Sequence, residues 1–235
     1  MRIAAISDLH MGDGRPWDRF GHSEAEFLEF LHFLEDRHEL VVVLGDLYET
    51  LQASRIGAYE AEVERCRRAW PRIDERLRGP RYVRLRGNHD EVLGRLERLP
   101  DRFRLEVSGV RILFLHGHQF DRVLAWTRPV VLVACWAAAF LARQGSNSLV
   151  EALEWADDRL NGVSEDPARC RYQAEALRFA AETDTHVIVL GHTHIAAVTR
   201  RLGRVYVNPG ACLAGRFGYA HLDPERGDYS TSLWP

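Results

Sequence analysis

The stretch Tyr82-Val83-Arg84-Leu85-Arg86-Gly87-Asn88-His89-Asp90 runs from an apolar segment, which predicts a buried strand, into a glycine turn with an amide, an imidazole and a carboxylate side by side. Four other apolar runs also predict buried strands, and each ends in polar residues that can bind metal. The four pairs are Ile3–Ile6 with Asp8-Leu9-His10, Val41–Leu44 with Gly45-Asp46, Ile112–Leu115 with His116-Gly117-His118, and Val187–Leu190 with Gly191-His192-Thr193-His194. Because strand ends crowd along one edge of a sheet, these polar residues are expected to meet in one site.

The polar set consists of carboxylates, an amide and imidazoles, which are ligands suited to manganese, iron, zinc or magnesium. Asp8 and His10 are two residues apart, so on an extended segment their side chains point the same way, and His192 and His194 repeat that spacing. Each motif alone is weak, because the D-x-H pattern is common and an aspartate after a strand often caps a helix. The ordered set of motifs is specific and predicts a metal site.

Length and charge limit the classes of protein to consider. The chain has 235 residues, enough for one large domain, and the motifs extend from residue 8 to residue 194 without a repeat or a linker. We therefore predict one domain over residues 1–235 with a helical insertion over residues 119–183. A net charge of −3 creates no overall field that recruits nucleic acid, so we predict no extended nucleic-acid surface.

The cysteines and the amino terminus both bear on the compartment. Four cysteines lie far apart with no C-x-x-C pair, which is typical of a reduced, intracellular protein. Met1 leads directly into the first predicted strand, and cleavage of a signal peptide would remove Asp8. We expect a cytoplasmic protein.

The remaining elements predict an α/β (α+β) fold. Ser23 and Glu26 form a capping box for a helix, and residues 55–78 predict one long helix. Residues around Ser108-Gly109 predict a hairpin, and residues 119–183 predict three helices. Strand–helix alternation early in the chain and hairpins late favour a two-sheet sandwich flanked by helices.

The ordered motifs, together with Val207-Asn208-Pro209-Gly210, resemble those of the calcineurin-like metallophosphoesterases from the first strand to residue 210. This resemblance implies a four-layer αββα sandwich with a helical lid insertion and two divalent metal ions, manganese first, with iron or zinc as alternatives. The first ion would be held by Asp8, His10, Asp46 and His194. The second would be held by Asp46, Asn88, His116 and His192, with Asp46 bridging. The resemblance also implies that His89 contacts the phosphoryl oxygens or protonates the leaving group, and that Asp90 orients His89.

Physical chemistry supports this arrangement independently of the family. Two divalent ions about 3.5–4 Å apart acidify a water and clamp both oxygens of an in-line displacement. A bridging carboxylate limits the repulsion between the ions, and phosphoryl transfer depends mainly on positioning and electrostatic stabilisation. We therefore predict a hydrolase of phosphate esters or diphosphate bonds.

The insertion bears on the substrate. Residues 129–141 are the most apolar stretch, and their 13 residues are fewer than the roughly 20 that cross a bilayer. They form either a buried core helix or a lid that receives an acyl chain or touches the membrane surface. The insertion is similar to that of the UDP-diacylglucosamine hydrolases, which cut a diphosphate bond in a nucleotide-linked lipid at the cytoplasmic face of the membrane. The best-known members of that subgroup carry arginine where this chain has His89, which favours a relative with broader or different specificity.

The partners predicted here are a phosphorylated small molecule or a lipid-linked substrate, with peripheral contact to the inner membrane face. The predicted substrate contacts are Arg122, Arg128, Arg143, Ser146, Asn147 and His118. Alternatives are a general phosphodiesterase or phosphatase acting on soluble nucleotides or nucleic acid, or a non-catalytic scaffold of the same fold. Degenerate scaffolds usually lose ligands, whereas this chain keeps every ligand and His89. The sequence leaves the oligomeric state open.

Overall fold

A computed structural model describes residues 1–15, 17–53, 55–121, 133–141, 144 and 148–235. Two five-stranded sheets form its centre, with strand orders β10-β9-β1-β2-β3 and β4-β5-β6-β8-β7. The first sheet contains β1 (Ile3–Ile6), β2 (Leu40–Val43), β3 (Tyr82–Arg84), β9 (Phe217–Asp223) and β10 (Asp228–Trp234). The second contains β4 (Arg102–Val107), β5 (Val110–Leu115), β6 (Val187–Val189), β7 (Ala197–Arg201) and β8 (Arg204–Asn208). The predicted two-sheet sandwich is confirmed.

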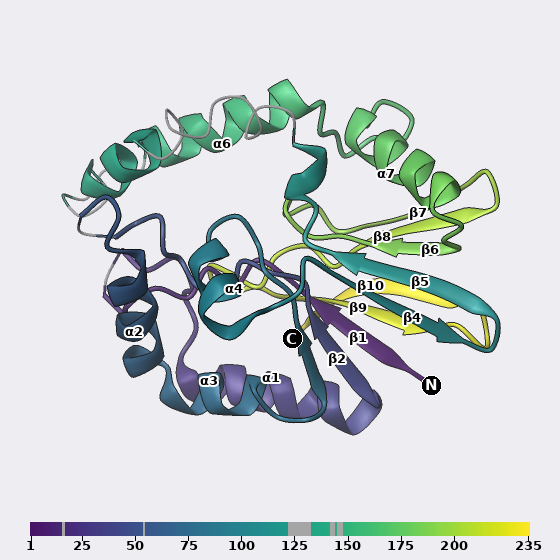
Figure 1. Ribbon diagram of the computed structural model, residues 1–235, viewed down its shortest axis with the longest axis horizontal. Helices are drawn as coiled ribbons and strands as arrows, with labels where there is room; N and C mark the ends of the chain where they lie inside the picture. The colour runs from purple at the N-terminus through teal and green to yellow at the C-terminus, as the bar shows by residue number, and fades with distance from the viewer. Residues whose placement is uncertain (16, 54, 122–132, 142–143, 145–147) are drawn as a thin grey trace.

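Three apolar cores separate four layers of structure. Along β1, Ile3 and Ala5 face the second sheet, while Ala4 and Ile6 face the helices, as the two-residue period of a strand requires. The outer face of the first sheet packs on α1 (Glu24–Arg37), α2 (Tyr59–Ala69) and α3 (Pro71–Leu77), and the outer face of the second packs on α7 (Arg171–Glu182). Figure 1 shows this order of helix, sheet, sheet and helix.

The strands that precede the predicted ligands run in the same direction. β1 pairs in parallel with β2, and β2 with β3, while β5 pairs in parallel with β6 in the second sheet. In Figure 1 the arrowheads of β1, β2 and β5 all point toward the middle of the molecule, near α4 (Glu91–Glu97). The loops that follow the carboxyl ends of these strands therefore lie close together.

The first helix begins as its sequence predicts. The Ser23 hydroxyl accepts a hydrogen bond from the Glu26 amide at 3.2 Å, and the Ser23 amide donates to the Glu26 carboxylate at 3.1 Å. This capping box satisfies amides that have no partner within the helix. The predicted apolar face of α1, Phe27, Phe30, Leu31 and Leu34, is buried.

Residues 55–78 do not form the single helix that we predicted. The stretch divides into α2 and α3 at Trp70, whose backbone has φ −127° and ψ 55°. Pro71 occupies the first turn of α3, where its missing N–H costs nothing, and its ring disfavours a helical conformation in the residue before it. The proline therefore explains the break.

The strand before Asn88 is also less buried than predicted. The three residues of β3 are half-buried, because β3 is the edge strand of the first sheet. The predicted hairpins are confirmed: β4 and β5 pair across Ser108-Gly109, and β7 and β8 pair across Leu202-Gly203.

Within residues 119–183 the described part forms a helix over residues 133–141, then α6 (Ser148–Asn161) and α7. Figure 1 shows α6 extending away from the sheets toward α2. In the helix over 133–141, Val133 is 54% exposed and Phe140 48% exposed, whereas Ala138 and Ala139 are buried. This part is not a fully buried core helix, and residues 129–132 lie outside the described residues. None of the described helices is long and apolar enough to cross a membrane.

Candidate metal centre

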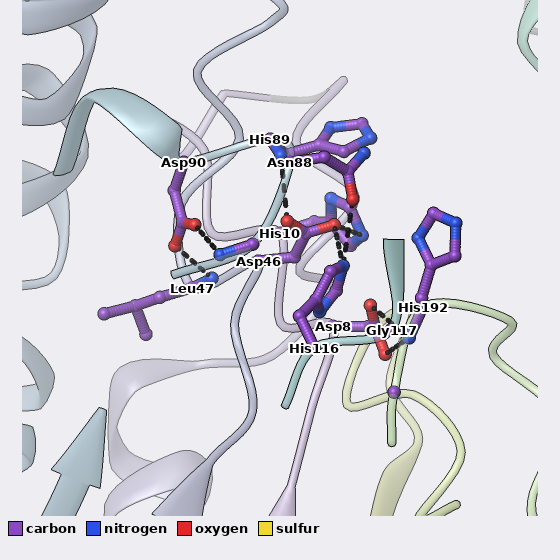
Figure 2. A network of polar contacts seen from close by, with 12 residues as sticks. Asp8, His10, Asp46, Leu47, Asn88, His89, Asp90, His116, Gly117 and His192 are labelled. Carbon is purple, nitrogen blue, oxygen red and sulfur yellow. Dashed lines mark hydrogen bonds and ion pairs between the residues drawn. The ribbon is translucent and has the colours of Figure 1, made fainter. Parts of the chain in front are cut away.

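The strand ends bring most of the predicted ligands together (Figure 2). Asp8, His10 and His194 offer ligand atoms within 4.8 Å of one another, as do Asp8, Asp46 and His116. Asp8 and Asp46 are buried carboxylates, and buried charges of one sign need cationic partners close by. The arrangement therefore has the composition of a cation site.

The backbone is unusual at the ligands themselves. Asp8, His10, Asp46, His192 and His194 all have positive φ, between 44° and 71°. L-residues seldom adopt this left-handed region, and such residues persist only where the surrounding structure enforces them, often at functional sites. Five of the seven predicted ligands thus share a conformation that turns the chain sharply at the strand end.

Two glycines allow the loops to approach the carboxylates. A Cβ on Gly87 would overlap the Asp46 carboxylate and amide. A Cβ on Gly191 would overlap the Ser7 hydroxyl and lie 2.8 Å from Asp8 Oδ2. The glycines of these two motifs are therefore required by close packing as well as by turn geometry.

The first ligand group lies around Asp8. His194 Nε2 is 3.6 Å from Asp8 Oδ1, and His10 Nε2 is 3.7 Å from Asp46 Oδ2. The amide of His192 donates to Asp8 Oδ2 at 3.0 Å, which fixes the carboxylate against the loop after β6. These are the residues predicted for the first ion.

The second ligand group lies on the other side of Asp46. His116 Nε2 is 3.2 Å from Asp46 Oδ2 and 2.9 Å from Asn88 Oδ1. Neighbouring ligands of one octahedral ion at about 2.1 Å stand about 3 Å apart, so this spacing suits a shared ion. Asp8 belongs to both groups, and Asp46 lies near a ligand of each, His10 in the first and His116 in the second, which is the position of a bridging carboxylate.

His192 stands apart from both groups. Its ring centroid is 5.2 Å from that of His116, and its Nε2 lies 3.3 Å from Asp121 Oδ2. Figure 2 shows the ring to one side of the contact between Asp46 and His116. Because Asp121 engages Nε2, Nδ1 is the atom that remains for an ion. Asp121 immediately follows η1 (His118–Phe120), and the sequence reasoning missed it.

The prediction that Asp90 orients His89 is wrong. Asp90 accepts hydrogen bonds from the Gly87 and Leu47 amides, each at 2.7 Å, and so ties together the loops after β2 and β3. Glu49 takes the expected place, with Oε2 2.8 Å from His89 Nδ1 and 3.0 Å from His10 Nδ1. Sequence reasoning missed Glu49, although it lies only three residues after Asp46.

Comparison with known proteins identifies the family of the chain. The calcineurin-like phosphoesterase superfamily domain matches residues 1–224. The chain belongs to this superfamily. A comparison with curated proteins gives no match. The superfamily typically uses two metal ions, and the ligand groups that share Asp8 provide candidate positions for them.

Several solved structures resemble the chain. Vps29 from Chaetomium thermophilum is 16% identical, with 100% of this chain and 94% of that chain covered and a TM-score of 0.48. The phosphoesterase YfcE from E. coli is 17% identical, with 99% and 98% covered and a TM-score of 0.47. An archaeal phosphodiesterase is 17% identical, with 100% of both chains covered and a TM-score of 0.45.

Electrostatics in the candidate metal centre show strong coupling between carboxylates and imidazoles. Burial alone would raise the pKa of Asp46, but the charges of His116 and His89 outweigh it and hold that pKa well below its usual range. Burial likewise opposes protonation of His116 and His89, but Asp46 raises the pKa of His116 to about 9, and Glu49 with Asp46 raises that of His89 to about 10. Burial and the charge of Asp46 raise the pKa of Asp90 to about 6. The buried carboxylates therefore favour the protonated, positively charged forms of His116 and His89.

The donor set fits divalent ions. In the part of the chain that the structure describes, the buried Nε2 of His10 has no hydrogen-bond partner, although it faces Asp46. His116 Nε2 faces two oxygen acceptors, those of Asp46 and Asn88, with at most one proton to share. An ion among these atoms would satisfy them all, and its oxygen and nitrogen ligands suit manganese, iron or zinc.

The predicted substrate contacts have different outcomes. The ring of His118 lies 5.4 Å from that of His116. Burial and the charge of His116 lower the pKa of His118 to about 3, so its imidazole is neutral. Its role in substrate binding stays a prediction. The other predicted contacts lie outside the described residues: Arg122, Arg128, Arg143, Ser146 and Asn147.

Proposed function

We propose that the protein is a dinuclear metal-dependent hydrolase of phosphate esters or diphosphates. One observation carries the proposal: the Asp46 carboxylate lies between two ligand groups, with Oδ2 3.7 Å from His10 Nε2 and 3.2 Å from His116 Nε2. A carboxylate shared in this way is what a two-metal site requires.

Each side chain has a proposed role in this reaction. Two divalent ions, when bound, supply Lewis acidity and an activated water for in-line displacement at phosphorus. The ions would be held by Asp8, His10, Asp46, Asn88, His116, His192 and His194. Glu49 engages His89 at Nδ1, so Nε2 is the atom that would contact the phosphoryl group and give its proton to the leaving oxygen.

The finer substrate proposal is a nucleotide-linked lipid. It is supported by the exposed apolar side chains of the described insertion: Val133, Phe140, Leu141, Trp155 and Leu160. Such side chains can take an acyl chain or contact a membrane surface. A soluble nucleotide remains the alternative.

A substrate panel tests the proposed function. Metal-free protein, prepared with a chelator, should be inactive, and added manganese should restore hydrolysis of bis(p-nitrophenyl) phosphate. The panel should also contain UDP-glucose and a UDP-linked diacylated sugar, so that a preference for the lipid can be measured. If the manganese-loaded protein hydrolyses no phosphate ester or diphosphate, the proposal of a hydrolase is contradicted and the alternative of a non-catalytic scaffold is favoured.

Asp121 supplies a second prediction. Replacing Asp121 by asparagine should weaken binding of one of two manganese ions about 10–100-fold, because residues that orient a metal-binding histidine contribute that much to affinity. Calorimetric titration of metal-free protein should then resolve one tight and one weakened site. Asp36→Asn is the matched control, since its side chain is 57% exposed and belongs to α1, on the outer face of the first sheet. Two unchanged sites in a folded Asp121→Asn variant would contradict the role of Asp121.

A further inference from the structure

A pocket of about 160 Å³ opens beside the metal centre. It lies between the loop that follows β1 and the segment that follows β2. We call it the arginine pocket, and its walls include Arg15, Trp17, Arg19, Glu49 and Arg65. Neither the metal ligands nor the predicted substrate contacts account for these arginines.

The arginine pocket adjoins the proposed proton donor. Glu49 forms part of its wall and also contacts His89 Nδ1 at 2.8 Å. Arg19, on the opposite loop, lines the same pocket as Glu49. The arginine pocket therefore lies next to His89, the residue proposed to protonate the leaving oxygen.

The wall on the β1 side is held in place by its own hydrogen bonds. The Asp18 carboxylate accepts from the amides of Gly12 at 3.0 Å, Gly14 at 2.8 Å and Phe20 at 3.0 Å. The indole of Trp70 donates to the Gly12 carbonyl at 3.0 Å. A Cβ on Gly12 would lie 2.9 Å from Asp18 Cγ, so the loop closes tightly around this carboxylate. A ligand would therefore meet a pre-organised surface.

The acidic residues around the pocket are already engaged. Asp13 lies 3.1 Å from Arg15, Glu62 pairs with Arg65, and Glu49 contacts two histidines. A guanidinium carries five N–H donors, and one carboxylate can accept at most two of them. Arg15 and Arg65 thus retain donors for a further anion, and arginine binds phosphate with directed, charge-assisted hydrogen bonds.

We propose that the arginine pocket binds a second phosphate, carried by the leaving group, so that the preferred substrates are diphosphates. This inference rests on the proposed function. The water oxygen bonds to the phosphorus at the metal centre, the bond from that phosphorus to the bridging oxygen breaks, and the second phosphate leaves with the electron pair. Guanidinium groups beside that phosphate stabilise the charge as it forms.

Trp17 gives the pocket an apolar side. Arg15 stacks over its ring, 5.4 Å from the centroid. The second phosphate therefore has room beside an indole for whatever it carries, either a nucleoside or an alkyl group from a lipid. Stacking of a base on an aromatic side chain contributes about 1–3 kcal/mol, so a nucleoside would depend on Trp17 and an alkyl chain would depend on it less.

The test compares kcat/KM for a diphosphate, UDP-glucose, with that for bis(p-nitrophenyl) phosphate, using manganese-loaded protein. In Arg15→Gln and Arg65→Gln, the ratio of the two values should fall about tenfold or more, the loss expected for a hydrogen bond to a charged group. Arg169→Gln is the control, because its side chain is 85% exposed, and it should keep the wild-type ratio. An unchanged ratio in folded Arg15→Gln would overturn the proposal.

Two further measurements keep the outcomes separate. Arg65 pairs with the buried Glu62, so a thermal melt must accompany that variant, whereas the Arg15 side chain is 58% exposed and its loss should leave folding intact. Hydrolysis of the single-phosphate diester by wild-type protein shows that the proposed function stands even if the pocket proposal fails. The last measurement uses a series of diphosphates that carry an alkyl group on one phosphate and a nucleoside on the other. If Trp17→Leu lowers kcat/KM only for substrates whose leaving phosphate carries the nucleoside, the occupant of the pocket is a nucleotide. If the arginine variants lower kcat/KM and Trp17→Leu does not, the occupant of the pocket is an alkyl phosphate.

Discussion

Replacing Asp46 by alanine is expected to abolish hydrolysis and to reduce occupancy of both metal positions together. Its Oδ2 atom is near His10 on one side and His116 on the other, and its Oδ1 accepts from the His89 amide at 2.9 Å. Two-metal activation is worth several kcal/mol, so the rate should fall about 10³-fold or more. Elemental analysis of the purified variant and assays at saturating manganese measure the two effects.

Asp36→Ala provides the matched control for this variant. Its carboxylate is 57% exposed on α1 and should affect neither metal content nor rate. Thermal melts distinguish loss of ions from loss of folding. Two ions per chain in folded Asp46→Ala would show that this carboxylate does not bridge, and the assignment of both ligand groups would have to change.

The general position of the site could be predicted because it depends on local sequence. A short apolar run followed by glycine and a polar residue identifies a strand end, and parallel strands place their ends at one edge. The pattern therefore located Asp8, Asp46 and His116 from sequence alone. The capping box at Ser23 was equally local, since both partners lie within four residues.

Glu49 and Asp121 could not be found in this way. Glu49 reaches both His10 and His89 because the chain turns through a left-handed conformation at Asp46, with φ 50°. No residue pattern indicates that direction. Asp121 meets His192 because β5 and β6 pair in parallel, and that pairing joins segments about 70 residues apart.

The half-burial of β3 also depends on the overall fold and could not be predicted from local sequence. The run from Tyr82 to Leu85 looks like the other apolar runs, but strand order places it at the edge of the first sheet. Edge position is a property of the whole sheet and leaves no signal in four residues. The break at Trp70 differs, because Pro71 stood in the sequence and its effect on the preceding residue could have been used.

His89→Ala is expected to keep both metal ions and to lower kcat by about 10²–10⁴-fold, the range for loss of a general acid. His89 lies outside the two groups that contain Asp8, and it clusters with His10 and Glu49 instead, so elemental analysis should give wild-type metal content if His89 is no ligand. The loss should shrink for aryl esters, whose leaving groups need no proton, and remain large for alkyl esters. Equal losses across that series would remove His89 from the role of acid.

A further prediction asks whether Glu49 assists His89 in proton transfer. In Glu49→Gln the side chain can still hydrogen-bond to His89 Nδ1, but the buried negative charge that favours the imidazolium is gone, so kcat for alkyl esters should fall. Because Glu49 also contacts His10 at 3.0 Å, the same change could act through the metals, and a double-mutant cycle separates the two routes. If Glu49 works through His89, adding Glu49→Gln to His89→Ala should cost little further rate for alkyl esters. If the two losses instead multiply, Glu49 serves His10 and the ions, and the pairing of Glu49 with His89 has no part in proton transfer.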